Sequence, residues 1–439
     1  MIRIENYAGA ERYLLGTIDE TVSRRTSYKL DRIRALLHEL GDPHRRYPII
    51  HVGGTSGKSS TSAMIASALQ AAGHRTGLHT KPHLHAMTER ARVDGRPVVA
   101  GRFAALLDGM MPAIERTTQR YGRPTYYETL LALAFVHFAH ERVAVAVIEV
   151  GLGGRLDGTN VIDPVVAAIT SVGFDHTDVL GSTIEEIAFE KAGIAKRGVP
   201  LVLAPVPEAA RTVIERYAQE AGAPVVHVAD VVRLELESND ERGQSVTVTT
   251  ARGAFALTTP VLGAFQRSNA ATAIAVLEHA GEELRPSVDA IVSGFAQLEI
   301  AGRMELLSRN PAVIFDVAHN AEKASSLVLS LRERFTGRRI HYVVAIGESK
   351  DARRILEILG ELPSTFTFTS FAVHGRRAIL PARLAAMAES LGGWGRAISD
   401  PTEAFSVARR LAAIDDVIVV TGSTFVVAGL REWYAPTAV

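Results

Sequence analysis

Apolar residues along this chain form short continuous runs that alternate with stripes at helical spacing, a pattern typical of strands and helices in succession. Near-continuous apolar runs at 143–150 and 165–170 predict strands that are buried on both faces of a parallel sheet. The stripe at 126–140 predicts a helix, and a small-residue helix is expected from Gly263 to about 280. Strict alternation within 226–260 instead predicts antiparallel hairpins at one edge.

The same pattern divides the chain into two predicted domains. Residues 1–47 carry apolar side chains at helical spacing and predict a helical cover packed on the first domain. After Gly302 the alternation begins again, with strands expected at 312–316 and 340–347 and a helix from 321. We therefore expect a second α/β domain with its own sheet, with the boundary near 297–302.

Composition excludes several classes of function. The 439 residues are 47% hydrophobic and 22% charged, and 48 Lys plus Arg balance 48 Asp plus Glu. Nothing therefore indicates a nucleic-acid or membrane partner selected by bulk charge. The absence of cysteine excludes disulfides, zinc–thiolate sites, iron–sulfur clusters and thiol catalysis. No signal peptide and no apolar run near the ~20 residues of a membrane span is present, so a cytoplasmic location is expected.

A glycine-rich turn at 53–58 joins an apolar run to a helical stripe. Glycines there allow successive N–H groups to point at an anionic phosphate at the positive end of the following helix. Lys58 would add a point charge, and the hydroxyl of one of the next three residues could reach Mg2+. Val52 stands where the strict P-loop pattern has glycine, so this is a variant loop. The flanking strand and helix favour a phosphate site over a surface turn.

Acidic and imidazole side chains occur at two predicted strand ends. Glu149 ends the 143–150 run, and Asp175 and His176 follow the next run. A carboxylate at the end of a buried strand is costly unless a cation offsets it. Ligands of open α/β sheets bind at such strand ends, so we expect Glu149 to open on the phosphate loop.

Taken together, these motifs resemble the folylpolyglutamate synthase and dihydrofolate synthase family, a branch of the Mur ligase superfamily. The resemblance spans nearly the whole chain. It implies an α/β fold with a P-loop Mur-ligase-type central domain and mainly parallel sheet at 1–297, and a smaller Rossmann-like amino-acid-binding domain at 302–439. The matching blocks are 51–58, 149–157, 175–177, 190–194, Gln266 with Asn269, Gly302 with Arg303, 316–320 and 421–423.

The resemblance further implies an ATP- and Mg2+-dependent amide ligase of folate biosynthesis and one-carbon metabolism, acting as a monomer on small-molecule substrates. A carboxylate of folate or pteroate type would take the γ-phosphoryl group of ATP. The amino group of an amino acid, glutamate, would then displace phosphate from the acyl phosphate. Such chemistry depends mainly on positioning and electrostatics.

The resemblance also assigns roles to individual residues. Structural roles compete with some of them: Asp316 and His319 could form a capped strand-to-helix turn, and Asn269 could cap its helix. The predicted sets are Lys58, Lys191 and His319 for catalysis; Gly54, Thr55, Gly57, Lys58, Ser59, Ser60, Asn269, Arg303 and Asp316 for the nucleotide; His83, Lys81 and Ser423 for substrates; and Glu149, His176 and carbamylated Lys191 for the metal.

Three positions depart from the family pattern. Ser56 and Ser59 replace an asparagine and a glycine of the phosphate loop, and Lys81 replaces a serine whose hydroxyl helps to hold Mg2+. Lys81 could contact a phosphate or carboxylate, stand in for part of the metal charge, or point to solvent. Two alternative functions follow: the same ligase chemistry on a non-folate acid, or a nucleotide-binding regulator without catalysis.

Overall fold

The computed structural model describes residues 3–18, 30–240, 243–261, 263–373 and 376–436. Their contacts define two compact units. Unit 1 comprises Met1–Glu235, Val246–Leu257 and Ser268–Leu298, and unit 2 comprises Leu236–Ser245, Thr258–Arg267 and Glu299–Val439. Parts of the predicted helical cover, residues 1–2 and 19–29, lie outside the described residues. The domain boundary near 297–302 stays a prediction.

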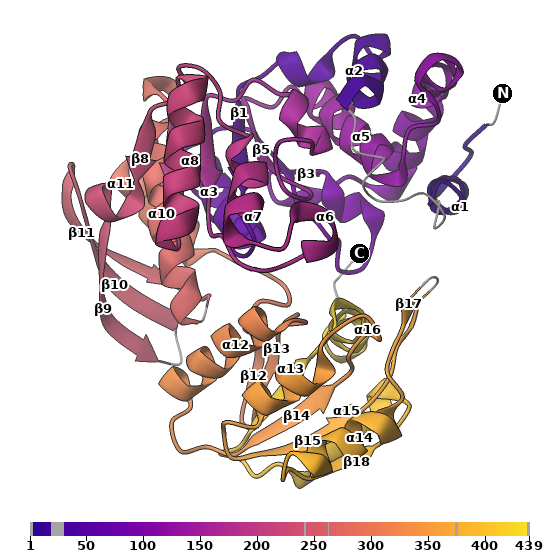
Figure 1. Ribbon diagram of the computed structural model, residues 1–439, viewed down its shortest axis with the longest axis vertical. Coiled ribbons are helices and arrows are strands. Elements are labelled where there is room, and N and C mark those ends of the chain that lie inside the picture. Colours follow the sequence, from indigo (N-terminus) through magenta and orange to yellow (C-terminus); the bar gives the residue numbers. More distant parts are fainter. Residues whose placement is uncertain (1–2, 19–29, 241–242, 262, 374–375, 437–439) are drawn as a thin grey trace. The chain divides into compact units, whose positions relative to one another are not determined.

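Unit 1 is built on an eight-stranded sheet (Figure 1). The strands from β2 to β8 in the sheet order run parallel, and β3 and β4 add an antiparallel edge. Strand β1 lies between β5 and β6, so the crossover from β5 to β6 passes over it, and such a switch point is where open α/β sheets bind ligands. The order is β4 (Arg96–Pro97), β3 (Arg92–Val93), β2 (Thr76–His79), β5 (Val145–Glu149), β1 (Ile49–Gly53), β6 (Val166–Ile169), β7 (Leu201–Leu203) and β8 (Val225–His227).

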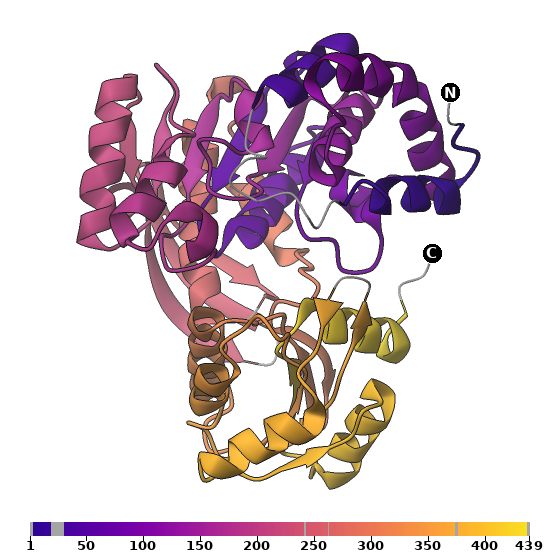
Figure 2. The same cartoon turned by 45° about the vertical axis from the view of Figure 1, so that its right-hand side comes forward.

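Helices cover this sheet through two hydrophobic cores. One core joins Ile49 and Ile148 of the sheet to α1 (Tyr7–Leu15), α2 (Leu30–Glu39), α4 (Ala100–Tyr121) and α5 (Tyr126–His140), which gather at one end of unit 1 in both views (Figures 1 and 2). The other joins β6 and β7 to α7 (Ile184–Ala192) and α8 (Glu208–Ala221). The remaining helical segments are α3 (Lys58–Ala71), η2 (Pro43–Arg45), η3 (Met87–Arg90), η4 (Gly158–Val161), α6 (Thr177–Leu180), α9 (Val228–Val231), η5 (Glu282–Leu284) and α11 (Val288–Ala296). Helix α10 (Ala264–His279) begins in unit 2 and continues in unit 1 from Ser268.

Helix α4 is absent from the sequence-based expectations although it spans 22 residues. Two glycines and Pro112 lie within it, and each weakens a helical pattern read from sequence alone. Its apolar face, including Phe103 and Leu107, is buried in the core. Tertiary packing therefore stabilises a helix that local propensity disfavours.

The predicted hairpins at 226–260 form, but not at the edge of the main sheet. A separate three-stranded sheet has the order β11 (Gly253–Thr259), β10 (Gly243–Thr250), β9 (Arg233–Asp240). Only two residues join β10 to β11, so these neighbours pair antiparallel. The predicted position of these hairpins at an edge of the main sheet was wrong, because β8 forms that edge. The hairpins instead pair with one another, which satisfies their backbone hydrogen-bonding groups within their own sheet.

Unit 2 contains a six-stranded sheet in which β12 is antiparallel and the other strands are parallel. Its order is β12 (Glu305–Arg309), β13 (Ala312–Phe315), β19 (Val417–Thr421), β14 (Ile340–Val344), β15 (Ser364–Phe368) and β18 (Gly395–Ala397). The helices are α12 (Ala321–Arg334), α13 (Ala352–Leu359), α14 (Pro381–Ser390), α15 (Pro401–Leu411) and α16 (Thr424–Tyr434), and β16 (Ala372–Val373) pairs with β17 (Arg376–Arg377).

The predicted fold class, α/β with a mainly parallel central sheet and a second, smaller α/β sheet, is confirmed. Within the described ranges, no helix is both long enough and apolar enough to cross a membrane.

Candidate active site

The phosphate loop is tied to the residues that follow β6. The Thr170 hydroxyl lies 2.6 Å from the carbonyl oxygen of Ser56 and 3.1 Å from that of Gly53. The N–H of Ser56 donates to the Ser171 hydroxyl at 2.8 Å. These bonds fix the loop at the junction of β1 and β6, so its conformation is set before any ligand arrives.

Two glycines of the loop are required by geometry. Gly54 and Gly57 have φ of 140° and 83°, values that L side chains rarely adopt. A Cβ at Gly54 would lie 2.1 Å from the Thr170 hydroxyl, and one at Gly57 would lie 2.3 Å from Oδ1 of Asn269. Asn269 of α10 therefore lies against the loop, and its contact with the nucleotide stays a prediction.

Lys58 begins α3 and bends back over the loop. Its Nζ donates to the carbonyl oxygens of Gly54 and Thr55 at 2.8 and 3.0 Å. An ammonium group and the positive end of a helix thus occur together, which is the arrangement expected of a phosphate site.

The hydroxyls of Ser59, Ser60 and Thr61, any of which could reach Mg2+ by the sequence alone, differ in their surroundings. Ser59 Oγ donates to Oε1 of Glu149 at 3.0 Å, whereas Ser60 and Thr61 are buried within α3. Ser59 is therefore the hydroxyl that the geometry favours beside a carboxylate.

Glu149 ends β5 and joins three segments of unit 1. Its carboxylate is buried, and its second oxygen accepts the backbone N–H of Lys81 at 3.1 Å. The sequence-based expectation that this strand end meets the phosphate loop agrees with the Ser59 bond. A carboxylate has about four lone-pair sites, and oxygen donors suit hard divalent cations. Glu149 and Ser59 together therefore fit Mg2+.

The other predicted metal ligands are placed differently. Lys191 is buried in the last turn of α7, whereas His176 is exposed and has φ of 52° just before α6. Within the described ranges, no group of three or more His, Cys, Asp or Glu could hold a metal. The predicted set has only two residues of these types, Glu149 and His176, so its grouping stays a prediction.

In unit 2 the predicted residues lie at the carboxyl ends of two adjacent parallel strands. Asp316 follows β13, and its carboxylate accepts the N–H groups of Met304 and Ala318 at 2.9 and 2.8 Å. Burial raises the pKa of Asp316, and nearby Arg303 opposes that rise. Ser423 follows β19 and caps α16. Asn320, not Asp316, caps α12, so Asp316 organises the turn between β13 and that helix without capping it, and its contact with nucleotide stays a prediction.

His319 is neutral at ordinary pH. Its Nδ1 donates to the carbonyl oxygen of Val317 at 2.8 Å, and its Nε2 lies 3.3 Å from the Lys323 ammonium. Burial, followed by repulsion from Lys323, lowers the pKa of His319 to about 3. A catalytic role for His319 would therefore use a neutral imidazole.

The sequence matches known protein families over both units. The Mur ligase middle domain matches residues 52–277, and the Mur ligase glutamate ligase domain matches residues 302–424. The dihydrofolate synthase/folylpolyglutamate synthase of Bacillus subtilis (strain 168) is 34% identical over 409 residues, 92% of this chain and 94% of the relative. The chain belongs to the folylpolyglutamate synthase/dihydrofolate synthase family.

Solved structures of the family agree over the full length. E. coli FolC in complex with DHPP and ADP superposes with a TM-score of 0.87 at 30% identity, covering 99% of both chains. The Yersinia pestis bifunctional folylpolyglutamate synthase/dihydrofolate synthase, complexed with AMPPNP and Mn ion, gives 0.85 at 29% identity, with 99% of each chain covered. The family and the ATP-dependent ligase class predicted from sequence are confirmed, and the roles of individual residues stay predictions.

Two acidic residues that fix loops near the site, Asp157 and Glu89, had no predicted role. Asp157 is buried; its Oδ2 accepts the N–H of Leu152 at 2.7 Å, and its Oδ1 accepts the Tyr127 hydroxyl at 3.0 Å and the Thr159 hydroxyl at 2.6 Å. It thereby fixes the glycine-rich turn after β5. In the sequence, the place of this acidic residue shortly after a glycine-rich turn could have indicated that role.

Glu89 also had no predicted role. Its carboxylate accepts three backbone N–H groups: those of His85 and Ala86 at 2.7 and 2.9 Å, and that of Leu84 at 3.0 Å. The loop after β2 is therefore wrapped around one acidic side chain. Within this loop, Arg90 donates to Nδ1 of the predicted substrate residue His83 at 3.0 Å, and burial lowers the pKa of His83 to about 4.

Glu89→Gln is expected to lower the free energy of unfolding by about 1–3 kcal/mol at pH 7, because an amide nitrogen cannot accept an N–H. Burial by itself raises the pKa of Glu89, but the three N–H groups together bring it below the ordinary 4.5. This stabilisation is therefore complete above pH 4.5 and is lost as the pH falls through the lower folded pKa. Denaturant unfolding between pH 3 and 7 measures the difference between the two proteins.

The exposed Glu115 of α4 supplies the control for that comparison, since Glu115→Gln should leave stability unchanged at each pH. Hydrogen exchange at Leu84–Ala86 should accelerate in Glu89→Gln alone. Equal stability of Glu89→Gln and wild type at pH 7 would contradict the role assigned to Glu89.

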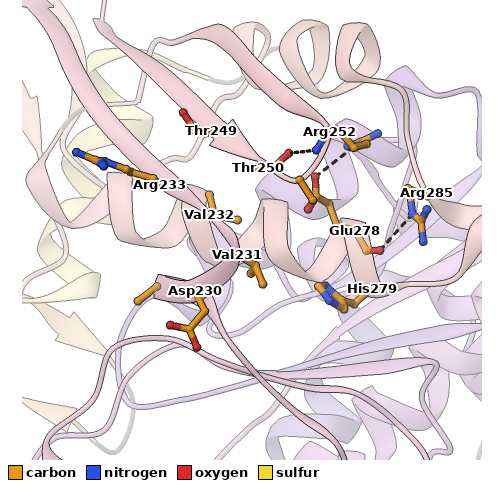
Figure 3. Close-up of a pocket in the computed structure, with 12 residues that line it drawn as sticks. Asp230, Val231, Val232, Arg233, Thr249, Thr250, Arg252, Glu278, His279 and Arg285 are labelled. Carbon is orange, nitrogen blue, oxygen red and sulfur yellow. Dashed lines mark hydrogen bonds and ion pairs between the residues drawn. The ribbon is translucent and has the colours of Figure 1, made fainter.

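A hollow of about 650 Å³ lies elsewhere on unit 1 (Figure 3). Arg252 donates to the Glu278 carboxylate at 3.1 Å and Arg285 to the Glu278 carbonyl oxygen at 3.2 Å, so both arginines already have hydrogen-bond partners there. None of the predicted site residues lines it. The chemistry of the phosphate loop, not the size of this hollow, therefore decides where the candidate site lies.

Proposed function

We propose that this chain joins glutamate to a carboxylate of folate or pteroate type, using ATP and Mg2+ through an acyl phosphate. The observation that carries the proposal is the cluster at the carboxyl ends of β1 and β5. There, Lys58 lies over the phosphate loop and Ser59 bonds to Glu149. Relatives that cover nearly the whole chain carry the names of these synthases, and their complexes hold ADP, AMPPNP and Mn.

In this proposal the protein's own groups act mainly by position and charge. The loop N–H groups and Lys58 hold the phosphates, so that the substrate carboxylate can attack the γ-phosphorus while ADP leaves. The amino group of glutamate then attacks the acyl carbon, phosphate departs, and the amine loses a proton. Mg2+ supplies charge neutralisation when bound, and Glu149 and the Ser59 hydroxyl would hold it.

The remaining assignments belong to the same proposal. Lys191, buried as a charged side chain rarely is, would carry a carbamate that serves the metal together with His176. Residues 1–297 would bind ATP with the help of Asn269, and residues 302–439 would supply His319 and Ser423 to the amino acid. A monomeric state and a cytoplasmic location complete the proposal.

The test is phosphate release by the purified protein with ATP, Mg2+ and glutamate, with dihydropteroate or a reduced folate as acid. We expect release only when both acid and glutamate are present, with the ligated product confirmed by mass spectrometry. A reaction without glutamate is the control. Nucleotide binding accompanied by no turnover on either acid would exclude the folate version and leave another carboxylic acid or a regulatory role.

A further inference from the structure

Lys81 is held beside the phosphate loop by its own backbone. It lies two residues after β2, and its N–H donates to Oε2 of Glu149 at 3.1 Å. Its carbonyl oxygen lies 3.4 Å from the hydroxyl of Ser59, which also bonds to Glu149. The position of Lys81 is thus fixed from both sides, by β5 and by the first turn of α3.

The Lys81 side chain is half-buried. Its ammonium interacts at longer range with Lys58, Glu149 and Asp157, but makes no hydrogen bond or ion pair with the part of the chain that the structure describes.

Lys58 and Lys81 therefore place like charges within electrostatic range of each other at the carboxyl edge of the sheet. Like charges held together in a half-buried site are costly, and a bound polyanion removes that cost. Lys58 already follows the phosphate loop, whereas Lys81 approaches from β2 on the far side of β5 in the sheet order. An anion that contacts both ammonium groups must therefore extend from the phosphate loop toward the end of β2.

We propose that Lys81 is a second phosphate-binding lysine, which acts with Lys58 on the terminal phosphates of the nucleoside triphosphate. This role of Lys81 rests on the proposed function, which identifies the ligand as a nucleoside triphosphate. A lysine binds phosphate as a point charge, and unlike a metal ion it cannot dissociate from the protein. Part of the charge compensation for the triphosphate is therefore always present, so some nucleotide affinity should persist when divalent cations are removed.

The experiment measures the affinity of the full-length protein for AMPPNP and for ADP by calorimetry, in EDTA and then with rising Mg2+. In EDTA, Lys81→Met should bind AMPPNP about 10- to 100-fold more weakly than wild type. Lys81→Arg, which keeps the charge, should stay within about threefold. The loss should be smaller for ADP, which lacks the terminal phosphate. No acid, amino acid or turnover is needed.

Lys196→Met is the matched control. Lys196 is also half-buried, but its ammonium donates to the carbonyl oxygen of Asn160 and it belongs to no predicted site. It should bind AMPPNP as wild type does. Lys81→Gln serves as the charge-free variant if circular dichroism shows that Lys81→Met is unfolded.

The outcomes separate this inference from the proposed function. Wild-type affinity of both charge-free variants in EDTA would overturn the role of Lys81, and equal losses for ADP and AMPPNP would overturn the assignment to the terminal phosphates. Failure of the wild-type protein to bind AMPPNP even with Mg2+ would instead remove the proposed function.

Discussion

Lys58→Ala is expected to reduce ATP turnover by about 10²- to 10³-fold, the loss typical when one preorganised charged donor is removed from a phosphoryl-transfer site. The Lys58 ammonium spans the loop carbonyls of Gly54 and Thr55 and is the cation directly attached to the phosphate loop. Alanine is a favourable residue in the first turn of a helix, so α3 should remain intact. Steady-state phosphate release measures the loss.

The control for Lys58→Ala is Lys196→Ala, which removes a half-buried lysine outside the predicted site. Both variants should give the circular dichroism spectrum of the wild type. Turnover in Lys58→Ala within twofold of wild type would refute the assigned phosphate site.

Glu149→Gln is expected to lower turnover by about 10²-fold and to raise the Mg2+ concentration needed for half-maximal rate. The amide has the same shape as the carboxylate but lacks its charge. Its nitrogen can face the Ser59 hydroxyl, which can rotate to accept, while its oxygen keeps the N–H of Lys81. The substitution therefore tests charge with little loss of structure. Rates measured across a Mg2+ series give the answer.

A surface carboxylate provides the comparison for this second variant. Glu141 pairs with Arg75 at an exposed position, and Glu141→Gln should keep the wild-type rate and Mg2+ dependence. If Glu149→Gln showed the same Mg2+ dependence as Glu141→Gln, Glu149 would not be a metal ligand.

Some of the site could be predicted from sequence because its signals are local. The order of strand, glycine-rich turn and helix at 49–71 depends on backbone angles and helical spacing, which neighbouring residues specify. The carboxylate at the end of the apolar 143–150 run pointed to the phosphate loop, because a buried charge needs a polar partner. The Ser59–Glu149 bond agrees with that reasoning.

Other features depend on residues far apart in the chain. Thr170 and Ser171 fix the phosphate loop although more than 110 residues separate them from it. The sequence could not show that the Lys81 ammonium lies near Lys58, because only packing determines its exposure and its neighbours.

The sequence alone therefore determined the α/β class, the phosphate loop and the family, since all three rest on local pattern and ordered motifs. Only the tertiary structure decided that Ser59 is the hydroxyl beside Glu149, that Glu89 and Asp157 organise their loops, and that α4 is a helix. The physical reason is that burial and long-range hydrogen bonds are properties of the packed chain. Neighbouring residues in the sequence do not specify them.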